Sequence, residues 1–338
     1  MDFFSILTML GGLALFLYGM DAMGQGLSRL SGGKMKRLLG KLTSNKIMAV
    51  LLGTGVTAVI QSSSATTVMV VGFVNAGLMK LSQAVGVIMG ANIGTTITSW
   101  FLSLAGIEGD SFLIRMLKPS SFAPVLAIIG VFLILFIKNQ RKKELGMILT
   151  GFAILMTGMD TMSGAVKPLA HNERFTGLLT MFSHPLLGMA AGTVITAVIQ
   201  SSSASIGILQ ALCATGAVGY DTAIPIIMGQ NIGTCVTAIL SSIGTGKNAR
   251  RAAAVHLYFN IIGTAIFLIT FYLCNAAFHF SFMGEAANAA GIAAIHSLFN
   301  ISATMLLLPF AGGLEKLAIL TIPDKKEQTG KKGNVSCH

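Results

Sequence analysis

The chain has 338 residues, of which 53% are hydrophobic and only 10% are charged. A soluble domain normally carries about 25% charged residues, so this composition excludes an ordinary water-facing surface and favours a protein that lies in lipid. The net charge of +11 sits in short basic clusters between apolar runs, which is typical of membrane-protein loops. We therefore expect a multi-pass membrane protein that lies in the lipid bilayer. We do not expect nucleic acid as a partner.

Seven apolar runs are each about long enough to cross roughly 30 Å of hydrocarbon as a helix. The first run begins at residue 3 without a basic leader, so we interpret it as a span and not as a cleaved signal peptide. The sequence therefore predicts an all-α membrane protein. The runs cover residues 3–27, 81–104, 119–137, 145–166, 219–243, 252–275 and 291–310.

Two other apolar segments, residues 47–79 and 186–218, are broken midway by the polar sequence Gln-Ser-Ser-Ser. Each arm has about 15 residues, or about 22 Å of helix, which is too short to cross a bilayer comfortably. Irregular backbone at that depth is tolerated only inside protein or beside water. We therefore predict two re-entrant hairpins whose polar tips lie near the middle of the membrane.

The sequence also aligns with itself at an offset of 139 residues. Residues 57–65 return unchanged as residues 196–204, and the patterns at 88–95 and 19–23 return at 227–234 and 158–162. Three matches at one offset indicate an internal duplication. The predicted organisation is a first repeat at 1–137, a basic cytoplasmic linker at 138–144, a second repeat at 145–275, an additional C-terminal span within 276–310 and a basic cytoplasmic tail at 311–338.

Basic residues predict the orientation of the repeats. The loop after the first run is rich in Lys and Arg, whereas its counterpart after the run at 145–166 has only Lys167 and Arg174, offset by Glu173. The positive-inside rule then places the first loop and the C-terminal tail in the cytoplasm and the N-terminus outside. The two repeats would be inverted, as in secondary transporters with a site at the repeat interface. The basic residues of the first loop are Arg29, Lys34, Lys36, Arg37, Lys41 and Lys46.

The Gln-Ser-Ser-Ser tips contain groups that suit a small charged solute. Serine is a favoured helix N-cap, and the free N–H groups at a helix start attract anions. Hydroxyls donate or accept hydrogen bonds, while amide carbonyl oxygens can face a cation. The alternative is that these side chains only hold helices together. We predict one shared solute site formed by Gln61, Ser62, Ser63, Ser64, Gln200, Ser201, Ser202 and Ser203.

The core segments lack cationic side chains. No Lys or Arg occurs in residues 47–79, 81–114 or 175–246. Burying an unpaired anion there is very costly, so bound cations would have to offset its charge. Hydroxyl, amide and carbonyl oxygens are the ligands that a small hard cation prefers. The sequence therefore favours cation-coupled transport of an anion.

Paired Gly-x-Asn-Ile-Gly-Thr segments lie inside the spans at 81–104 and 219–243. We expect their glycines to loosen the helix so that backbone carbonyls and side chains bind cations; close helix packing is the alternative. Thr96, Thr98 and Thr237 are further candidates nearby. The predicted cation (sodium) ligands are Gln61, Ser64, Thr66, Asn92, Thr95, Gln200, Ser203, Ser205, Asn231 and Thr234.

Four other residues recur in pairs and have open roles. Asp21 and Asp160 occupy matching positions inside spans, where acidic residues mark functional sites, although a solvated helix end explains them equally well. His256 and His296 each precede an asparagine by four residues, which places both side chains on one helix face. We favour a packed helix contact for these histidines over a lining of the transport path.

At the twin Gln-Ser-Ser-Ser and Gly-x-Asn-Ile-Gly-Thr motifs the sequence resembles the type II sodium/phosphate cotransporter family. The resemblance runs over about residues 11–310. It implies sodium-coupled symport of inorganic phosphate across the cell (inner) membrane by alternating access, with no enzymatic activity and no cofactor besides sodium as the coupling ion. It also implies that residues 61–64 and 200–203 contact phosphate and help to bind sodium.

The sequence departs from that family in two places. Animal members of the family look to carry an acidic residue in a His-Asp-x-x-Asn stretch of the first repeat, which is linked to an electrogenic sodium site. Residues 118–124 of this chain read Lys-Pro-Ser-Ser-Phe-Ala-Pro and lack that pattern. The sodium stoichiometry therefore stays open. Many bacterial relatives append a PhoU-like helical domain, and we expect none here because only a short basic tail follows residue 310.

Three alternative functions stay open. The first is a sodium- or proton-coupled transporter of another small anion or polar solute, and the second is a channel. The third is a membrane enzyme with a serine nucleophile, which is disfavoured because neither hairpin carries a histidine or acidic residue that could act as its base. The oligomeric state is also open, with a homodimer as one candidate, as is the direction of flux.

Overall fold

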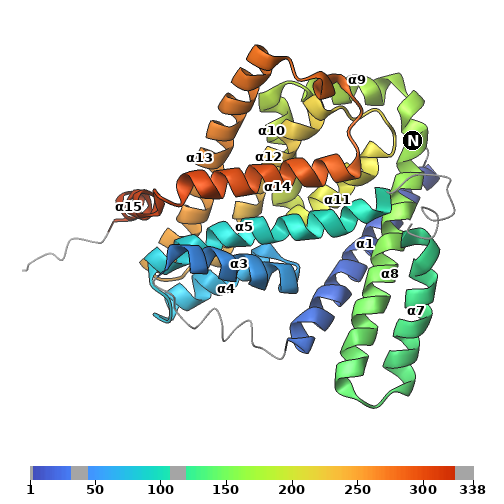
Figure 1. Ribbon diagram of the computed structural model, residues 1–338, viewed down its shortest axis with the longest axis horizontal. Helices are drawn as coiled ribbons and strands as arrows, with labels where there is room; N and C mark the ends of the chain where they lie inside the picture. Colours follow the sequence, from blue (N-terminus) through green and yellow to red (C-terminus); the bar gives the residue numbers. More distant parts are fainter. Residues whose placement is uncertain (1–2, 32–44, 107–118, 324–338) are drawn as a thin grey trace, which may run out of the picture.

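The computed structural model describes residues 3–31, 45–106 and 119–323. Within these ranges the regular elements are helices, apart from one isolated bridge between Gly219 and Ala286. Figure 1 shows two groups of helices: α1, α7 and α8 lie side by side, and the remaining helices form a second, larger group. The helical fold agrees with the composition, because helices satisfy their own backbone groups in lipid.

The first group is built on the antiparallel pair α1 (Phe3–Leu30) and α8 (Gln140–Val166). A Cβ atom added at Gly12 would lie 2.9 Å from the Met162 nitrogen, and one added at Gly19 would lie 2.3 Å from the Leu155 nitrogen. Residues later in α1 therefore face residues earlier in α8, as expected for antiparallel helices. Glycine allows the two backbones to approach this closely. Helix α7 (Pro119–Phe136) packs against α8.

Helices α3 (Lys46–Ile60), α4 (Ser63–Asn75) and α5 (Leu81–Ser103) form the next unit. A Cβ atom at Gly90 would lie 1.9 Å from the Val50 carbonyl oxygen, and one at Gly94 would lie 2.5 Å from Thr57 Cβ. Residue numbers rise together along this contact, so α3 and α5 are parallel. Helix α4 connects them and must therefore run back in the opposite direction.

The second half repeats this unit with α10 (Pro185–Ile199), α11 (Ser202–Cys213) and α12 (Tyr220–Ser241). A Cβ atom at Gly229 would lie 1.9 Å from the Met189 carbonyl oxygen, and one at Gly233 would lie 2.5 Å from the Thr193 carbonyl oxygen. Helices α10 and α12 are thus parallel as well. A short helix that the sequence did not predict, α9 (Glu173–Phe182), precedes this unit.

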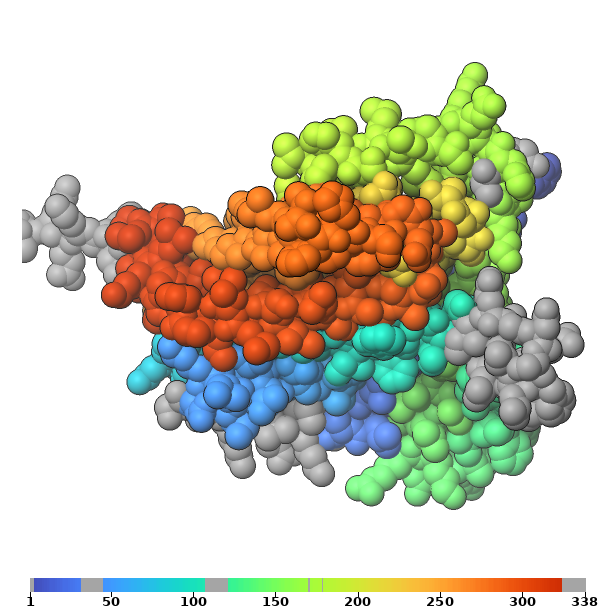
Figure 2. Space-filling view, turned by 45° about the horizontal axis from the view of Figure 1, so that its top comes forward, coloured from blue at the N-terminus to red at the C-terminus, as the bar shows by residue number. Residues whose placement is uncertain are grey.

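Helices α13 (Lys247–Phe278) and α14 (Ala289–Leu307) pack against both α5 and α12. In Figure 2 the orange and red residues of this region lie between the yellow-green α9–α10 segment and the blue α3–α4 segment. The two helix–break–helix units are therefore joined through a shared group of central helices.

Six of the seven predicted spans are confirmed as long apolar helices. Helices α1, α5, α8, α12, α13 and α14 are long and apolar enough to cross a membrane. The run predicted at 119–137 forms α7, but its apolar part at Ser121–Phe136 is shorter than the other six. The described part of the chain therefore has the composition of a multi-pass membrane protein.

Several boundaries differ from the predicted ones. Helix α8 begins at Gln140, inside the predicted linker at 138–144, because the Asn139 side chain accepts a hydrogen bond from the Lys142 nitrogen at 3.3 Å and caps it. Helix α13 begins at Lys247, before the predicted start at 252. The predicted tail contains α15 (Ala311–Thr321).

Some predictions lie outside the described residues. These are the tail beyond residue 323, most of the basic loop after α1 and the loop at 107–118.

Candidate solute site

The two Gln-Ser-Ser-Ser tips have almost the same backbone. Gln61 has φ 59° and ψ 24°, and Gln200 has φ 60° and ψ 20°. Both values lie in the left-handed region, which is uncommon for residues other than glycine. The backbone N–H of each glutamine donates to a threonine carbonyl four residues earlier, Thr57 or Thr196, at 2.7 Å. The repeated sequence therefore ends α3 and α10 in the same way.

The serines after each glutamine start the next helix. Ser62 Oγ accepts from the Ala65 nitrogen at 3.1 Å, and Ser201 Oγ accepts from the Ala204 nitrogen at 3.2 Å. These two serines are thus the N-caps of α4 and α11. Ser63 and Ser202 are the first helical residues, and both are buried. Each tip consequently presents a helix start, where N–H groups favour an anion.

The structure brings the two tips together. Ser64 Oγ in the first tip donates to the Gln200 carbonyl oxygen in the second at 3.3 Å. Each tip glutamine is also held by a threonine from its own half. Thr98 Oγ1 donates to Gln61 Oε1 at 2.9 Å, and Thr237 Oγ1 donates to the Gln200 carbonyl oxygen at 3.5 Å. Helices α5 and α12 therefore each support one tip.

A cavity of about 320 Å³ reaches both tips, and we call it the tip pocket. One wall is the C-terminal half of α1, where the Gln25 side chain donates to the Asp21 carboxylate at 2.7 Å. The tips form the other wall. No Lys or Arg is among the described residues that line it. The lining residues are Met20, Asp21, Gly24, Gln25, Ser28, Ile60, Gln61, Ser62, Ala65 and Ser201.

The predicted cation ligands next to the tips differ between the two halves. In the first half, Thr57 Oγ1 donates to Thr66 Oγ1 at 3.0 Å across the break between α3 and α4. In the second half, the equivalent hydroxyls of Thr196 and Ser205 are buried and have no hydrogen-bond partner within the described chain. The second pair could therefore accept a ligand that supplies the missing interaction.

Two asparagines predicted to bind cations are engaged with the paired His-x-x-x-Asn patterns. Asn92 Nδ2 donates to Asn260 Oδ1 at 2.7 Å, and His256 Nε2 lies 3.3 Å from Asn92 Oδ1. In the other half, Asn231 Nδ2 donates to Asn300 Oδ1 at 3.2 Å. Likewise, His296 Nε2 lies 3.4 Å from Asn231 Oδ1. All six side chains are buried, so the histidines make packed polar contacts between helices. The sequence interpretation favoured such a helix contact for the histidines, but it did not identify Asn92 and Asn231 as their partners.

The expectation that the Gly-x-Asn-Ile-Gly-Thr segments loosen their helices is wrong. Helices α5 and α12 run unbroken through both segments. Thr95 Oγ1 donates to the Ala91 carbonyl oxygen at 3.2 Å, and Thr234 Oγ1 donates to the Gln230 carbonyl oxygen at 2.9 Å. The glycines instead let α3 pack closely against α5, as at Gly90, and α10 pack closely against α12.

The two aspartates that occupy matching positions have different surroundings. Asp21 lines the tip pocket, which sequence reasoning did not foresee. Asp160 lies away from the tips and lines another cavity at the C-terminal end of α8. Matching sequence positions therefore do not have the same access to the tips in this conformation.

Comparisons with known proteins agree with the duplication. A family model described as Na+/Pi-cotransporter matches residues 15–164 and again residues 154–296. The uncharacterized protein YqeW of Bacillus subtilis is 31% identical over 261 residues, which cover 76% of this chain and 79% of that protein. No solved structure matches.

Two relatives have names that describe a function. The "Putative inorganic phosphate export protein YjbB" of Escherichia coli (strain K12) is 27% identical over 265 residues, covering 78% of this chain but 46% of its own length. The human "Sodium-dependent phosphate transport protein 2B" is 35% identical over 130 residues, 36% of this chain and 19% of that protein. The chain thus spans about half the length of YjbB. Because the family model matches most of the chain, we conclude that the chain belongs to the Na+/Pi-cotransporter family.

Proposed function

We propose that the protein couples the movement of inorganic phosphate to that of sodium across the cell membrane by alternating access. The observation that carries this proposal is the contact between the tips, where Ser64 Oγ lies 3.3 Å from the Gln200 carbonyl oxygen. Two helix starts and their serines meet at this point, and a cavity leads to it. Phosphate would accept hydrogen bonds from the N–H groups and hydroxyls there.

The surroundings of the tips support cation coupling. The described lining of the tip pocket contains the Asp21 carboxylate and no cationic side chain, so an anion alone would be repelled. No group of three or more His, Cys, Asp or Glu side chains in the described chain could hold a metal ion. The hydroxyl and carbonyl oxygens at the tips are the type of ligand that hard cations bind. The unpartnered hydroxyls of Thr196 and Ser205 are the strongest candidates.

We also propose that the two repeats insert in opposite orientations. The antiparallel packing of α1 and α8, which occupy matching places in the repeats, supports this topology. The parallel pairs α3/α5 and α10/α12 support re-entrant hairpins, because α4 and α11 must each turn back. With the basic loop after α1 in the cytoplasm, the tip pocket opens inward, and the N-terminus lies outside.

Uptake of labelled phosphate into proteoliposomes tests the function directly. Sodium and proton gradients should be imposed one at a time, and efflux should be measured as well as influx. We expect an inward sodium gradient to drive accumulation and a proton gradient to have no effect. Accumulation driven by protons alone would contradict sodium coupling, and a flux that ignores the sodium gradient would indicate a channel.

Competition separates phosphate from other solutes. Excess sulfate or a small carboxylate should leave sodium-driven phosphate uptake nearly unchanged if phosphate is the substrate. Strong inhibition by one of these anions, with its own sodium-driven accumulation, would favour the alternative of a transporter for another small anion.

A further inference from the structure

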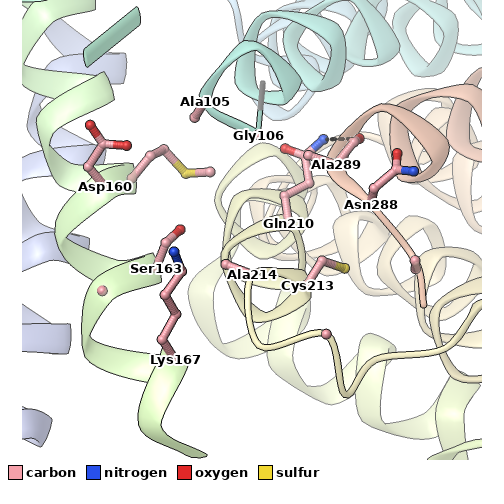
Figure 3. Close-up of a pocket in the computed structure, with 14 residues that line it drawn as sticks. Ala105, Gly106, Asp160, Ser163, Lys167, Gln210, Cys213, Ala214, Asn288 and Ala289 are labelled. Carbon is pink, nitrogen blue, oxygen red and sulfur yellow. Dashed lines mark hydrogen bonds between the residues drawn. The ribbon is translucent and has the colours of Figure 1, made fainter. Parts of the chain in front are cut away.

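A second cavity, of about 620 Å³, lies at the C-terminal end of α8 (Figure 3). Its walls come from α8, the C-terminal end of α11, the turn after α5 and the start of α14. We call this cavity the α8 vestibule. The side chains on which the argument depends are Ser163, Lys167 and Gln210.

The α8 wall of the vestibule corresponds position by position to the α1 wall of the tip pocket. The α1 residues are Met20, Asp21, Gly24, Gln25 and Ser28. Adding the repeat offset of 139 gives Met159, Asp160, Ser163, Gly164 and Lys167, all of which line the vestibule. Because α1 and α8 are antiparallel, these equivalent walls lie toward opposite ends of the pair. The vestibule is therefore the counterpart of the tip pocket on the other side of the protein.

The vestibule does not reach the tips in this conformation. Its lining includes Gln210, eight residues beyond the start of α11, and neither Gln-Ser-Ser-Ser tip. Gln210 Nε2 donates to the Ser99 carbonyl oxygen at 3.1 Å and to the Ala289 carbonyl oxygen at 2.9 Å. These bonds tie α11 to α5 and α14 beneath the cavity. A solute bound in the vestibule would therefore not contact either tip in this conformation.

The polar groups of the vestibule include both donors and acceptors. Gln210 is 3% exposed, and its Oε1 has no hydrogen-bond partner within the described chain. In Figure 3 this oxygen lies on the side of the Gln210 side chain that faces α8, where Ser163 and Lys167 project, whereas the Asp160 carboxylate points away from Gln210. Lys167 takes the place of Ser28 in the tip pocket, so among the described lining residues the vestibule has a cationic side chain and the tip pocket has none.

We propose that the α8 vestibule is a second, transient site for a protonated oxyanion of the phosphate class. Lys167 and Ser163 donate to the charged oxygens, while Gln210 Oε1 accepts from a P–O–H group. Sulfate carries no proton near neutral pH, so the Gln210 oxygen would face its negative charge without a donor, which disfavours sulfate. This proposal rests on the proposed function, because it treats phosphate as the solute that passes through.

Removing the charge of Lys167 tests the site in transport. In intact cells that lack other phosphate uptake, Lys167→Gln should raise the KM for external phosphate about threefold to tenfold and leave the maximal rate unchanged. The KM difference should shrink at high ionic strength. Arg174→Gln, which changes an exposed arginine in the first turn of α9 on the same predicted side of the membrane, is the matched control. An unaltered KM and salt dependence in Lys167→Gln would overturn the proposal.

A chemical protection experiment tests the site without transport. Ser163→Cys in a Ser202→Ala background should react with a small charged thiol reagent, and phosphate should slow the reaction severalfold. The Ser202→Ala parent controls for the native Cys213, which also lines the vestibule. Equal rates with and without phosphate, or equal protection by sulfate, would contradict the site as proposed. Protection by phosphate, combined with no sodium-driven phosphate uptake by the unmodified protein in proteoliposomes, would instead contradict the proposed function and still support the vestibule site.

Discussion

The two Gln-Ser-Ser-Ser tips have nearly identical backbones, yet their side chains are satisfied differently. In the first tip, Gln61 is buried and its side-chain oxygen accepts from Thr98, while Thr57 bonds to Thr66. In the second tip, Gln200 is exposed, and the hydroxyls equivalent to Thr57 and Thr66 have no hydrogen-bond partner within the described chain. Duplication has thus preserved the fold of the tip and changed its side-chain contacts.

This difference shows that a repeated motif does not require a repeated role. Buried hydroxyls that lack a partner cost stability unless a ligand or water satisfies them. The first tip meets that requirement with its own threonines, whereas in the second tip two oxygens, Thr196 Oγ1 and Ser205 Oγ, have no hydrogen-bond partner among the described residues. We therefore expect the first tip to act mainly as a preformed scaffold and the second to depend more on bound sodium.

The largest effects should come from substitution of the glycines that let α5 and α12 pack closely against α3 and α10. Gly90→Ala and Gly229→Ala each place a Cβ atom 1.9 Å from a backbone carbonyl oxygen, of Val50 and Met189 respectively. Overpacking of this kind costs about 1–3 kcal/mol or more, because backbone must move. Folded yield and thermal stability in detergent should fall strongly and equally in both variants.

The control for these variants is Gly72→Ala in α4, where the new Cβ atom meets nothing within 4 Å. Because alanine is the better helix former, its stability should be unchanged or slightly higher. A strong loss in only one of the two glycine variants would show that the halves do not share the same helix contact.

Removing one tip serine should impair transport severely in either half. Ser63→Ala and Ser202→Ala each delete a buried hydroxyl at a helix start. A hydrogen bond to a charged group contributes about 1.5–3 kcal/mol, which corresponds to a loss of roughly 10-fold to 100-fold in transport efficiency. Sodium-driven phosphate uptake in proteoliposomes measures this loss. Full activity in one of the two variants would mean that the tips do not form a single site.

The sharpest test of the difference between the tips compares Thr57→Val with Thr196→Val. Thr57→Val breaks a bond to Thr66 and should lower stability by about 1 kcal/mol. Thr196→Val removes a hydroxyl without a partner in the described chain, so its stability should be unchanged or higher. The sodium concentration that Thr196→Val needs for half-maximal phosphate uptake should instead rise severalfold. Unfolding in detergent and the sodium dependence of uptake would distinguish these outcomes, and equal behaviour of both variants would remove the distinction between the tips.

Much of this fold could be predicted because apolar length and internal repetition are local, countable properties. The breaks between α3 and α4 and between α10 and α11 were predicted, since the polar Gln-Ser-Ser-Ser sequence interrupts runs that are otherwise apolar. The start of α8 was missed because it is fixed by one capping side chain, Asn139, within a basic stretch. The short helix α15 was missed because it lies in a segment interpreted only by its charge.

The candidate site was harder to predict, because its details depend on contacts between distant parts of the chain. The bond between Asn92 and Asn260 joins residues 168 positions apart. The glycines were interpreted as weak points because their packing partners on α3 and α10 could not be identified from sequence. Similarly, Asp21 and Asp160 match in sequence, and only the conformation of the molecule places Asp21 in the pocket that reaches the tips.

The smallest expected effects concern the threonines that support the tip glutamines. Thr98 donates to the Gln61 side-chain oxygen at 2.9 Å, whereas Thr237 donates to the Gln200 carbonyl oxygen at the long distance of 3.5 Å. Thr98→Val should therefore reduce the rate of phosphate uptake by about threefold to tenfold, in line with one lost hydrogen bond, and Thr237→Val by less. Uptake measured at saturating sodium would show this order. A larger effect at Thr237 would mean that the second tip, and not the first, depends on support from its own half.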